Sequence, residues 1–96
     1  MKVYIAGKIS GLTPEEFHKK FNECRDEVAK HVEYGDIITP TDLCEDDWDW
    51  DKCMETCIPV MMKCDLVVMM PDWVDSKGAK VEKKIAHEAG IPIWYL

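Results

Sequence analysis

Residues 66–70, Leu-Val-Val-Met-Met, are apolar at every position. A strand with water on one face alternates apolar and polar side chains, so an unbroken apolar run is typical of a strand buried on both faces. Such strands occur mainly in parallel sheets that helices cover on both sides. This run therefore predicts an α/β domain in which residues 66–70 form a central strand of a parallel sheet.

Three further short apolar runs, residues 3–6, 37–39 and 91–95, predict the remaining strands, and helical stretches separate them. This alternation is the pattern of a parallel sheet covered by helices. Right-handed crossovers favour the spatial order 2-1-3-4, a flavodoxin-like or Rossmann-like three-layer sandwich. The 96 residues match one such domain, residues 1–96, with one modest core.

The first helix is predicted to begin at Pro14, because Thr13 is a good capping residue and Glu16 completes a capping box. It should run to Tyr34 and end at Gly35. Its core face comprises Phe17, Phe21, Cys24, Val28 and Val32. A second helix follows the acidic residues 42–51, and Pro59 should kink or divide it near residues 55–58. The third helix should span residues 76–89.

The net charge of −7 repels phosphate backbones, so we expect no nucleic acid polymer as a partner. No apolar run approaches the roughly 18 residues that a membrane span requires, and a predicted strand begins at once, without a signal segment. We therefore expect a cytoplasmic protein that does not bind membranes. Five cysteines are an odd number in such a chain, which favours free thiols over a disulfide framework.

Metal and cofactor motifs are weak. Cys53 and Cys57 stand four residues apart, which is compatible with zinc, but no second pair has metal-ligand spacing, so we predict no metal site. Residues 47–51 resemble the start of a calcium loop, yet Lys52 stands where the turn glycine belongs, and a solvated acidic loop is the better interpretation. No motif indicates a cofactor.

In the order 2-1-3-4 the first and third strands are neighbours and the winding reverses between them, which is where open α/β sheets bind ligands. The loops that meet there are residues 7–11 and 71–76. The first loop, Gly7-Lys8-Ile9-Ser10-Gly11, lets backbone donors approach a ligand. It matches neither a dinucleotide nor a phosphate-loop motif, so a simple strand-to-helix turn is an equal alternative.

Glu82 is the acidic residue that helical spacing turns inward. It lies three residues after Ala79 and four before Ala86, within the apolar stripe of the third helix. In the second turn the helix dipole favours an ionised acid, which is available as a nucleophile. The alternative is a carboxylate that only complements the dipole. Asp72 and Asp75, near the end of the third strand, are further catalytic candidates.

Three segments carry a resemblance to a known family. They are Gly7-x-Ile9-x-Gly11, the pair Cys64-Asp65 before the apolar strand, and Pro71-x-Trp73-x-x-Ser76-x-Gly78-Ala79-x-x-Glu82. Together they resemble a family of small, largely uncharacterised bacterial and phage proteins that is similar to nucleoside 2-deoxyribosyltransferases. The resemblance covers nearly the whole chain, and residues 76–82 are its most specific part.

The resemblance implies a nucleoside or nucleotide ligand, with Glu82 as the nucleophile that attacks the anomeric carbon of the sugar. Ser76 and Gly78 would then lie at the sugar. The opposite wall would comprise Gly7, Lys8 and Ser10, and Gly11 of the same loop is a further ligand-binding candidate. Apart from the resemblance, we expect Trp73 either to stack on a base or to serve the core or an interface. The position of Asp72 and Asp75 after the third strand makes either one a candidate to protonate the leaving base.

An enzyme that transfers or hydrolyses an N-glycosidic bond is thus the first hypothesis. The alternative is a non-catalytic protein that binds a nucleotide-derived ligand, because Lys84 stands where the larger enzymes have glycine. A purely structural module is the third. A small four-stranded sheet leaves edges poorly covered, so we expect a homodimer or higher oligomer, with Trp48 or Trp50 at its interface. A monomer that folds these rings onto its own core is the alternative.

Overall fold

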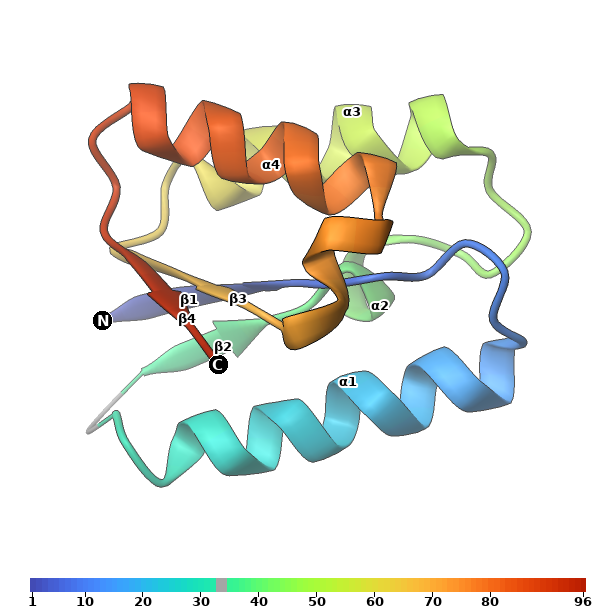
Figure 1. Ribbon diagram of the computed structural model, residues 1–96, viewed down its shortest axis with the longest axis horizontal. Helices are drawn as coiled ribbons and strands as arrows, with labels where there is room; N and C mark the ends of the chain where they lie inside the picture. The colour runs from blue at the N-terminus through green and yellow to red at the C-terminus, as the bar shows by residue number, and fades with distance from the viewer. Residues whose placement is uncertain (33–34) are drawn as a thin grey trace.

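The computed structural model describes residues 1–32 and 35–96. Its parallel strands are β1 (Lys2–Ala6), β2 (Asp36–Ile38), β3 (Leu66–Met69) and β4 (Ile93–Tyr95), in the order β2-β1-β3-β4. Figure 1 shows this sheet between α1 (Pro14–Ala29) on one side and α3 (Trp50–Met61) and α4 (Lys77–Glu88) on the other. The predicted α/β class and the strand order 2-1-3-4 are confirmed.

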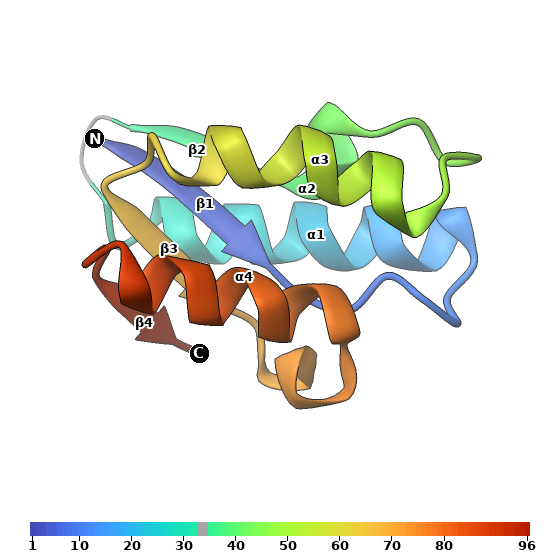
Figure 2. The ribbon, with the colours of Figure 1, turned by 90° about the horizontal axis from the view of Figure 1, so that it is seen from above.

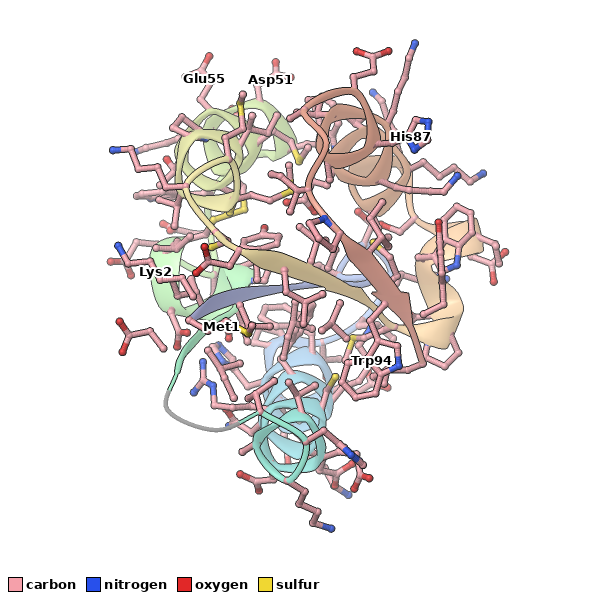
Figure 3. The ribbon with its side chains drawn as sticks, turned by 90° about the vertical axis from the view of Figure 1, so that its left-hand side faces the viewer. Met1, Lys2, Asp51, Glu55, His87 and Trp94 are labelled. Carbon is pink, nitrogen blue, oxygen red and sulfur yellow. A yellow bond between two sulfur atoms is a disulfide. The ribbon has the colours of Figure 1, made fainter. Side chains whose placement is uncertain are left out.

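The central strands are buried on both faces. In β1, Val3 and Ile5 pack toward α1, whereas Tyr4 and Ala6 pack toward α3 and α4. β3 alternates in the same way, as the unbroken apolar run predicted. Figure 3 shows the three layers end-on, with Trp94 of β4 on the α1 side of the sheet. The Tyr4 phenol therefore stands inside the core layer between the sheet and the helices α3 and α4.

The capping box of α1 forms as predicted. The Glu16 N–H donates to Thr13 Oγ1 at 3.2 Å, and the Thr13 N–H donates to Glu16 Oε1 at 2.9 Å. The buried face comprises Phe17, Phe21, Cys24 and Val28. The helix ends at Ala29, earlier than predicted, because the chain must turn back to pair Asp36 with Lys2 in the sheet. Val32 is half-buried beyond the helix end, and the predicted end at Tyr34 lies outside the described residues.

The second crossover differs from the prediction in two ways. A short helix, α2 (Pro40–Leu43), follows β2, and Thr39 and Asp42 form a capping box around its first turn. The prediction allowed a kink or a division near residues 55–58; α3 runs through Pro59 as one element, so the division is wrong. Pro59 leaves the carbonyl four residues earlier without its helical donor, but it lies two residues before the helix ends, so little of the helix follows it.

The connection from β3 to α4 positions the first turn of α4. A 3-10 helix, η1 (Pro71–Asp75), stands where a loop was predicted. Ser76 then caps α4, because its Oγ accepts a 3.1 Å hydrogen bond from the Ala79 N–H. Gly90 follows α4 with a φ of +75°, a left-handed conformation that glycine adopts readily. From above, α3 and α4 lie side by side over the sheet (Figure 2).

Among the described residues, no helix is both long enough and apolar enough to cross a membrane.

Candidate functional site

A cavity of about 150 Å³ lies above the sheet, beside β1 and between α3 and α4. Tyr4 of β1 and Gly7, which directly follows β1, form its floor, and Met54 and Cys57 of α3 form one wall. The acidic segment 45–49 lies along its outer side. The cavity is thus found beyond the carboxyl end of β1, at the reversal of winding where the sequence predicted a ligand site.

The cavity brings together part of the predicted site. The predicted residues that line it are Gly7, Ser10, Ser76, Gly78 and Glu82. The predicted residues that lie outside its lining are Lys8, Gly11, Asp72, Trp73 and Asp75. The loop after β1 and the first two turns of α4 therefore contribute to the cavity as predicted, whereas η1 lies outside it. Much of the remaining lining comes from residues 40–57, which sequence reasoning did not assign to the site.

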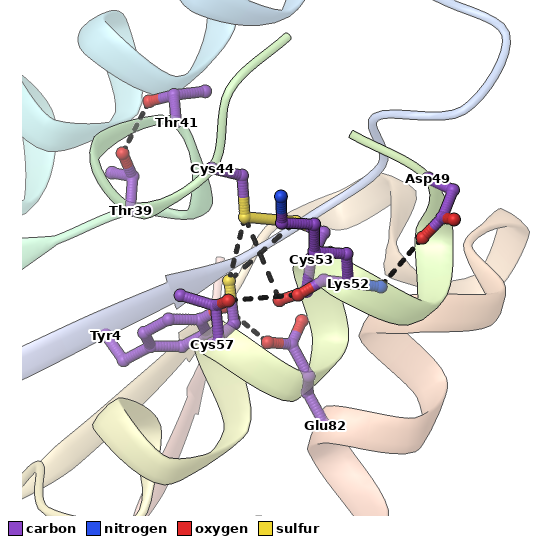
Figure 4. Close-up of a disulfide and its surroundings, with 10 residues drawn as sticks. Tyr4, Thr39, Thr41, Cys44, Asp49, Lys52, Cys53, Cys57 and Glu82 are labelled. Carbon is purple, nitrogen blue, oxygen red and sulfur yellow. Dashed lines mark hydrogen bonds between the residues drawn. A yellow bond between two sulfur atoms is a disulfide. The ribbon is translucent and has the colours of Figure 1, made fainter. Parts of the chain in front are cut away.

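Glu82 points inward from α4, as its spacing predicted, and only 3% of it is exposed. The Tyr4 hydroxyl donates a hydrogen bond to its carboxyl oxygen Oε2. Figure 4 shows both side chains directed toward one another beside Cys57. Burial raises the pKa of Glu82 to about 7, although the hydrogen bond from Tyr4 lowers it. Desolvation therefore outweighs the expected preference for the ionised acid, and both protonation states are populated near neutral pH.

Tyr4 remains protonated in this pair. Burial, followed by the nearby Glu82 charge, raises the pKa of the phenol well above its ordinary value of 10.0. The phenol therefore serves as a constant donor that fixes one oxygen of the carboxyl group.

Sequence reasoning missed Tyr4 as a site residue and assigned it only to the first strand. A signal existed, because a tyrosine in a strand buried on both faces needs a partner for its hydroxyl. Its partner stands 78 residues away, so the pairing itself could not be read from local spacing.

The charge of the cavity is one-sided. Its acidic lining residues are Glu45, Asp46, Asp49 and Glu82. None of the described residues that line it is a lysine, arginine or histidine. At the rim, the Nζ atoms of Lys52 and Lys77 lie 4.2 and 4.0 Å from the ring centroids of Trp48 and Trp50. The interior therefore favours a neutral or cationic group over a phosphate.

Gly78 allows α3 and α4 to come close beside the cavity. A Cβ at this position would lie 3.2 Å from Met54 Sδ and 3.2 Å from Trp50 Nε1, both tighter than ordinary contacts. A larger residue here would have to displace one of these side chains, both of which line the cavity. The absence of a side chain thus preserves the shape of the site.

Asp72 connects the loop after β1 to η1. Its Oδ1 accepts a 3.1 Å hydrogen bond from the Lys8 N–H, and its Oδ2 accepts one of 2.6 Å from Lys20 Nζ. Lys20 also donates to the Lys8 carbonyl. Asp75 is exposed. The contacts of Asp72 are those of a residue that holds the loop in place.

Trp73 contacts the far edge of the sheet. Its ring lies 5.8 Å from the ring of Tyr95, measured between centroids, and Lys83 Nζ lies 5.1 Å from its centroid. These contacts involve β4 and the outer side of α4, whereas the tryptophans that line the cavity are Trp48 and Trp50.

Cys44 and Cys53 form a disulfide, so the expectation that all cysteines are free thiols is wrong. Their Cα atoms lie 5.6 Å apart, within the range that a disulfide spans. The segment between them turns back and brings the end of α2 against the first turns of α3. The prediction rested on the odd number of cysteines and on the missing signal segment, neither of which indicates that the path of a loop brings Cys44 to Cys53. Cys24, Cys57 and Cys64 are free and buried.

The comparisons with known proteins give a family. The sequence model of a domain of unknown function, DUF4406, matches residues 1–95. A search of the curated proteins finds no match to the chain. The matched region includes every strand of the sheet and every residue that lines the cavity.

Proposed function

The chain belongs to the family of the domain of unknown function DUF4406, and we propose that it cleaves or transfers the N-glycosidic bond of a nucleoside with Glu82 as nucleophile. The observation that carries the proposal is a buried carboxyl group on a cavity wall, held by the Tyr4 hydroxyl where the winding of the sheet reverses. The resemblance of residues 76–82 to nucleoside 2-deoxyribosyltransferases supports the same role for Glu82.

In the proposed reaction a Glu82 carboxylate oxygen attacks the anomeric carbon of the sugar. The bond from that carbon to the base nitrogen breaks, its electron pair leaves with the base, and the base takes up a proton from solvent at the open side of the cavity. Water then opens the glycosyl ester in hydrolysis, or the nitrogen of a second base opens it in transfer. Either route regenerates the carboxylate.

The size of the cavity indicates how a nucleoside would lie. A volume of about 150 Å³ is below the roughly 300–1,000 Å³ of pockets that enclose a drug-sized ligand. We therefore place the sugar inside, against Gly7 and Gly78, and the base at the mouth, where Trp48 and Trp50 offer aromatic faces. Tyr4 holds one oxygen of Glu82 and leaves the other for the sugar.

The acidic lining predicts a preference for nucleosides over nucleotides. A 5′-monophosphate would bring negative charge toward Glu45, Asp46 and Asp49. We expect kcat/KM for a deoxynucleoside to exceed that for its 5′-monophosphate by at least about tenfold, or about 1.4 kcal/mol. Base release from a panel of deoxynucleosides and matched monophosphates, followed by chromatography, measures this ratio.

Two variants make that measurement decisive. If Lys77 at the rim bound a phosphate, the enzyme would prefer the monophosphate, and Lys77→Met would abolish that preference. Lys63 is an exposed lysine beyond α3, so Lys63→Met would leave the preference unchanged. That result would overturn the choice of a neutral ligand. No base release from any member of the panel would overturn the proposed reaction itself.

A non-catalytic binding protein is the second candidate function. The observation that favours it is the Glu82 pKa of about 7, because a protonated carboxyl group is a hydrogen-bond donor and a poor nucleophile. Calorimetry with nucleosides, nucleotides and ADP-ribose-like ligands separates the two functions. Binding without product, unchanged in Glu82→Gln, would favour the binding protein.

We further propose that two copies associate through the β4 edge, in place of the interface at Trp48 or Trp50 that the sequence suggested, because both of those tryptophans line the cavity. Exposed apolar side chains stand at the end of this strand, with Tyr95 47% and Leu96 40% exposed. The sheet ends at β4, so its outer edge can pair with another chain. Light scattering at micromolar concentration should give about twice the 11.1 kDa of one chain. Leu96→Asp should give a monomer, whereas Met62→Asp, at an exposed position beyond α3, should not. A wild-type mass near 11.1 kDa would overturn the proposal.

A further inference from the structure

Three sulfur atoms gather on the wall of the cavity. Cys57 Sγ lies 3.4 Å from Cys44 Sγ and 3.9 Å from Cys53 Sγ, and all three lie within 4.8 Å of one another. Figure 4 shows them between the end of α2 and the start of α3, next to Tyr4 and Glu82. A disulfide uses two of these sulfurs and leaves the buried Cys57 thiol within 4 Å of both.

The local structure presents these cysteines together. Cys53 and Cys57 are four residues apart on α3 and therefore share one face of the helix. Cys44 is the C-terminal cap residue of α2. The segment between α2 and α3 ends at Asp49, which caps α3 by accepting a 2.8 Å hydrogen bond from the Lys52 N–H. Two of the three sulfurs thus project from a rigid helix, and the third follows a short capped one.

We propose that Cys44, Cys53 and Cys57 bind one Zn²⁺ as thiolates when the disulfide is reduced. Thiolates about 2.3 Å from a tetrahedral zinc ion lie about 3.8 Å from one another. The two distances from Cys57, 3.4 and 3.9 Å, lie on either side of that value. Only Cys44 and Cys53 need to move apart, and breaking their bond permits this. Sulfur ligands select zinc over magnesium and calcium, which prefer oxygen.

Zinc binding at this site requires that the Cys44–Cys53 disulfide first be reduced. A thiol reductant supplies two electrons and two protons, which convert the disulfide to two thiols, and is itself oxidised to a disulfide. Zinc then displaces one proton from each of the three thiols into solvent. The carboxylates of Glu45 and Asp49 on the same cavity add attraction for a dication. Because all three cysteines line the cavity, the fourth zinc position is left for water or a ligand atom there.

The test starts with the unmutated protein. Chain reduced with a phosphine under anaerobic conditions and then desalted should bind about one zinc per chain in a competition with a chromophoric chelator. Co²⁺ should give thiolate charge-transfer bands and the visible bands of a tetrahedral site. Chain with the disulfide intact should bind zinc at least about a hundredfold more weakly, because two of the three ligands are then blocked. This comparison needs no variant and no assumption about the reaction at Glu82.

Variants locate the site. Cys57→Ser should lose the charge-transfer bands and bind zinc at least about a hundredfold more weakly. Loss of a group that only hydrogen-bonds to a ligand lowers metal affinity roughly 10–100-fold, and loss of a ligand itself should lower it further. Cys64→Ser is the matched control, because Cys64 is buried outside the cluster and its Sγ donates to the Val60 carbonyl at 3.4 Å, as a serine hydroxyl also can. Circular dichroism verifies that both fold. Absence of zinc from the reduced wild type, or equal binding by the two variants, would overturn the site.

Discussion

At pH 8 the Glu82→Gln variant should unfold at a temperature on the order of 10 °C above that of the wild type. Burial raises the pKa of Glu82 to about 7 in the folded protein, against an ordinary value of 4.5. At about 1.4 kcal/mol per pH unit, this difference makes the ionised side chain cost on the order of 3 kcal/mol of folding free energy. Glutamine has nearly the same shape, keeps an oxygen to accept the Tyr4 hydrogen bond, and carries no charge.

The sign of the effect follows from the proton balance. Between the two pKa values the folded protein holds a proton that the unfolded chain has released. The contribution of Glu82 to wild-type stability is therefore fully present below about pH 4.5, falls as the pH rises toward about 7, and changes no further above that. Glu82→Gln lacks this decline, so the difference in melting temperature should grow with pH.

Thermal unfolding followed by circular dichroism at several pH values measures this difference, with a chelator present and no reductant, so that the disulfide stays intact and metal is absent. Glu55→Gln is the matched control, because Glu55 is exposed and points outward from α3, away from the sheet (Figure 3). Its melting temperature should follow that of the wild type at each pH. Equal melting temperatures of the wild type and Glu82→Gln at pH 8 would show that burial does not raise the pKa of Glu82.

The second large effect is on turnover. In Glu82→Gln, base release from a deoxynucleoside should fall by at least about a thousandfold, because a neutral amide cannot form the glycosyl ester. The same variant should be more stable than the wild type at neutral and higher pH, so the loss could not be attributed to unfolding. Unchanged turnover would remove Glu82 from the role of nucleophile.

The wild-type enzyme should show the matching pH dependence. Since the attacking group is the carboxylate, kcat/KM should rise about tenfold per pH unit below about pH 7 and level off above it. Activity and stability should thus change with pH in opposite directions. Asp75→Ala is the control for turnover, because Asp75 is exposed and lies outside the cavity lining, and it should retain base release within a few-fold. A loss as large as that of Glu82→Gln would restore Asp75 as a candidate for proton transfer to the base.

The sequence by itself determined the features that depend on local periodicity. The apolar run at residues 66–70 required a strand buried on both faces, and the spacing of Ala79, Glu82 and Ala86 turned a carboxyl group toward the sheet. The order of the strands followed because right-handed crossovers between parallel strands leave few arrangements. Each of these inferences uses backbone geometry that is the same in every protein.

Only the tertiary structure decided which side chains meet. Tyr4 and Glu82 are 78 residues apart, and Lys8 and Asp72 are 64 apart, so no local pattern relates them. Cys44 joins Cys53 and Cys57 only because the acidic segment folds back against α3. Likewise, the Glu82 pKa depends on how completely the surrounding layers exclude water, and the sequence indicated only that the residue faces inward. Such contacts arise from the packing of whole elements, which side-chain shape and loop path determine together.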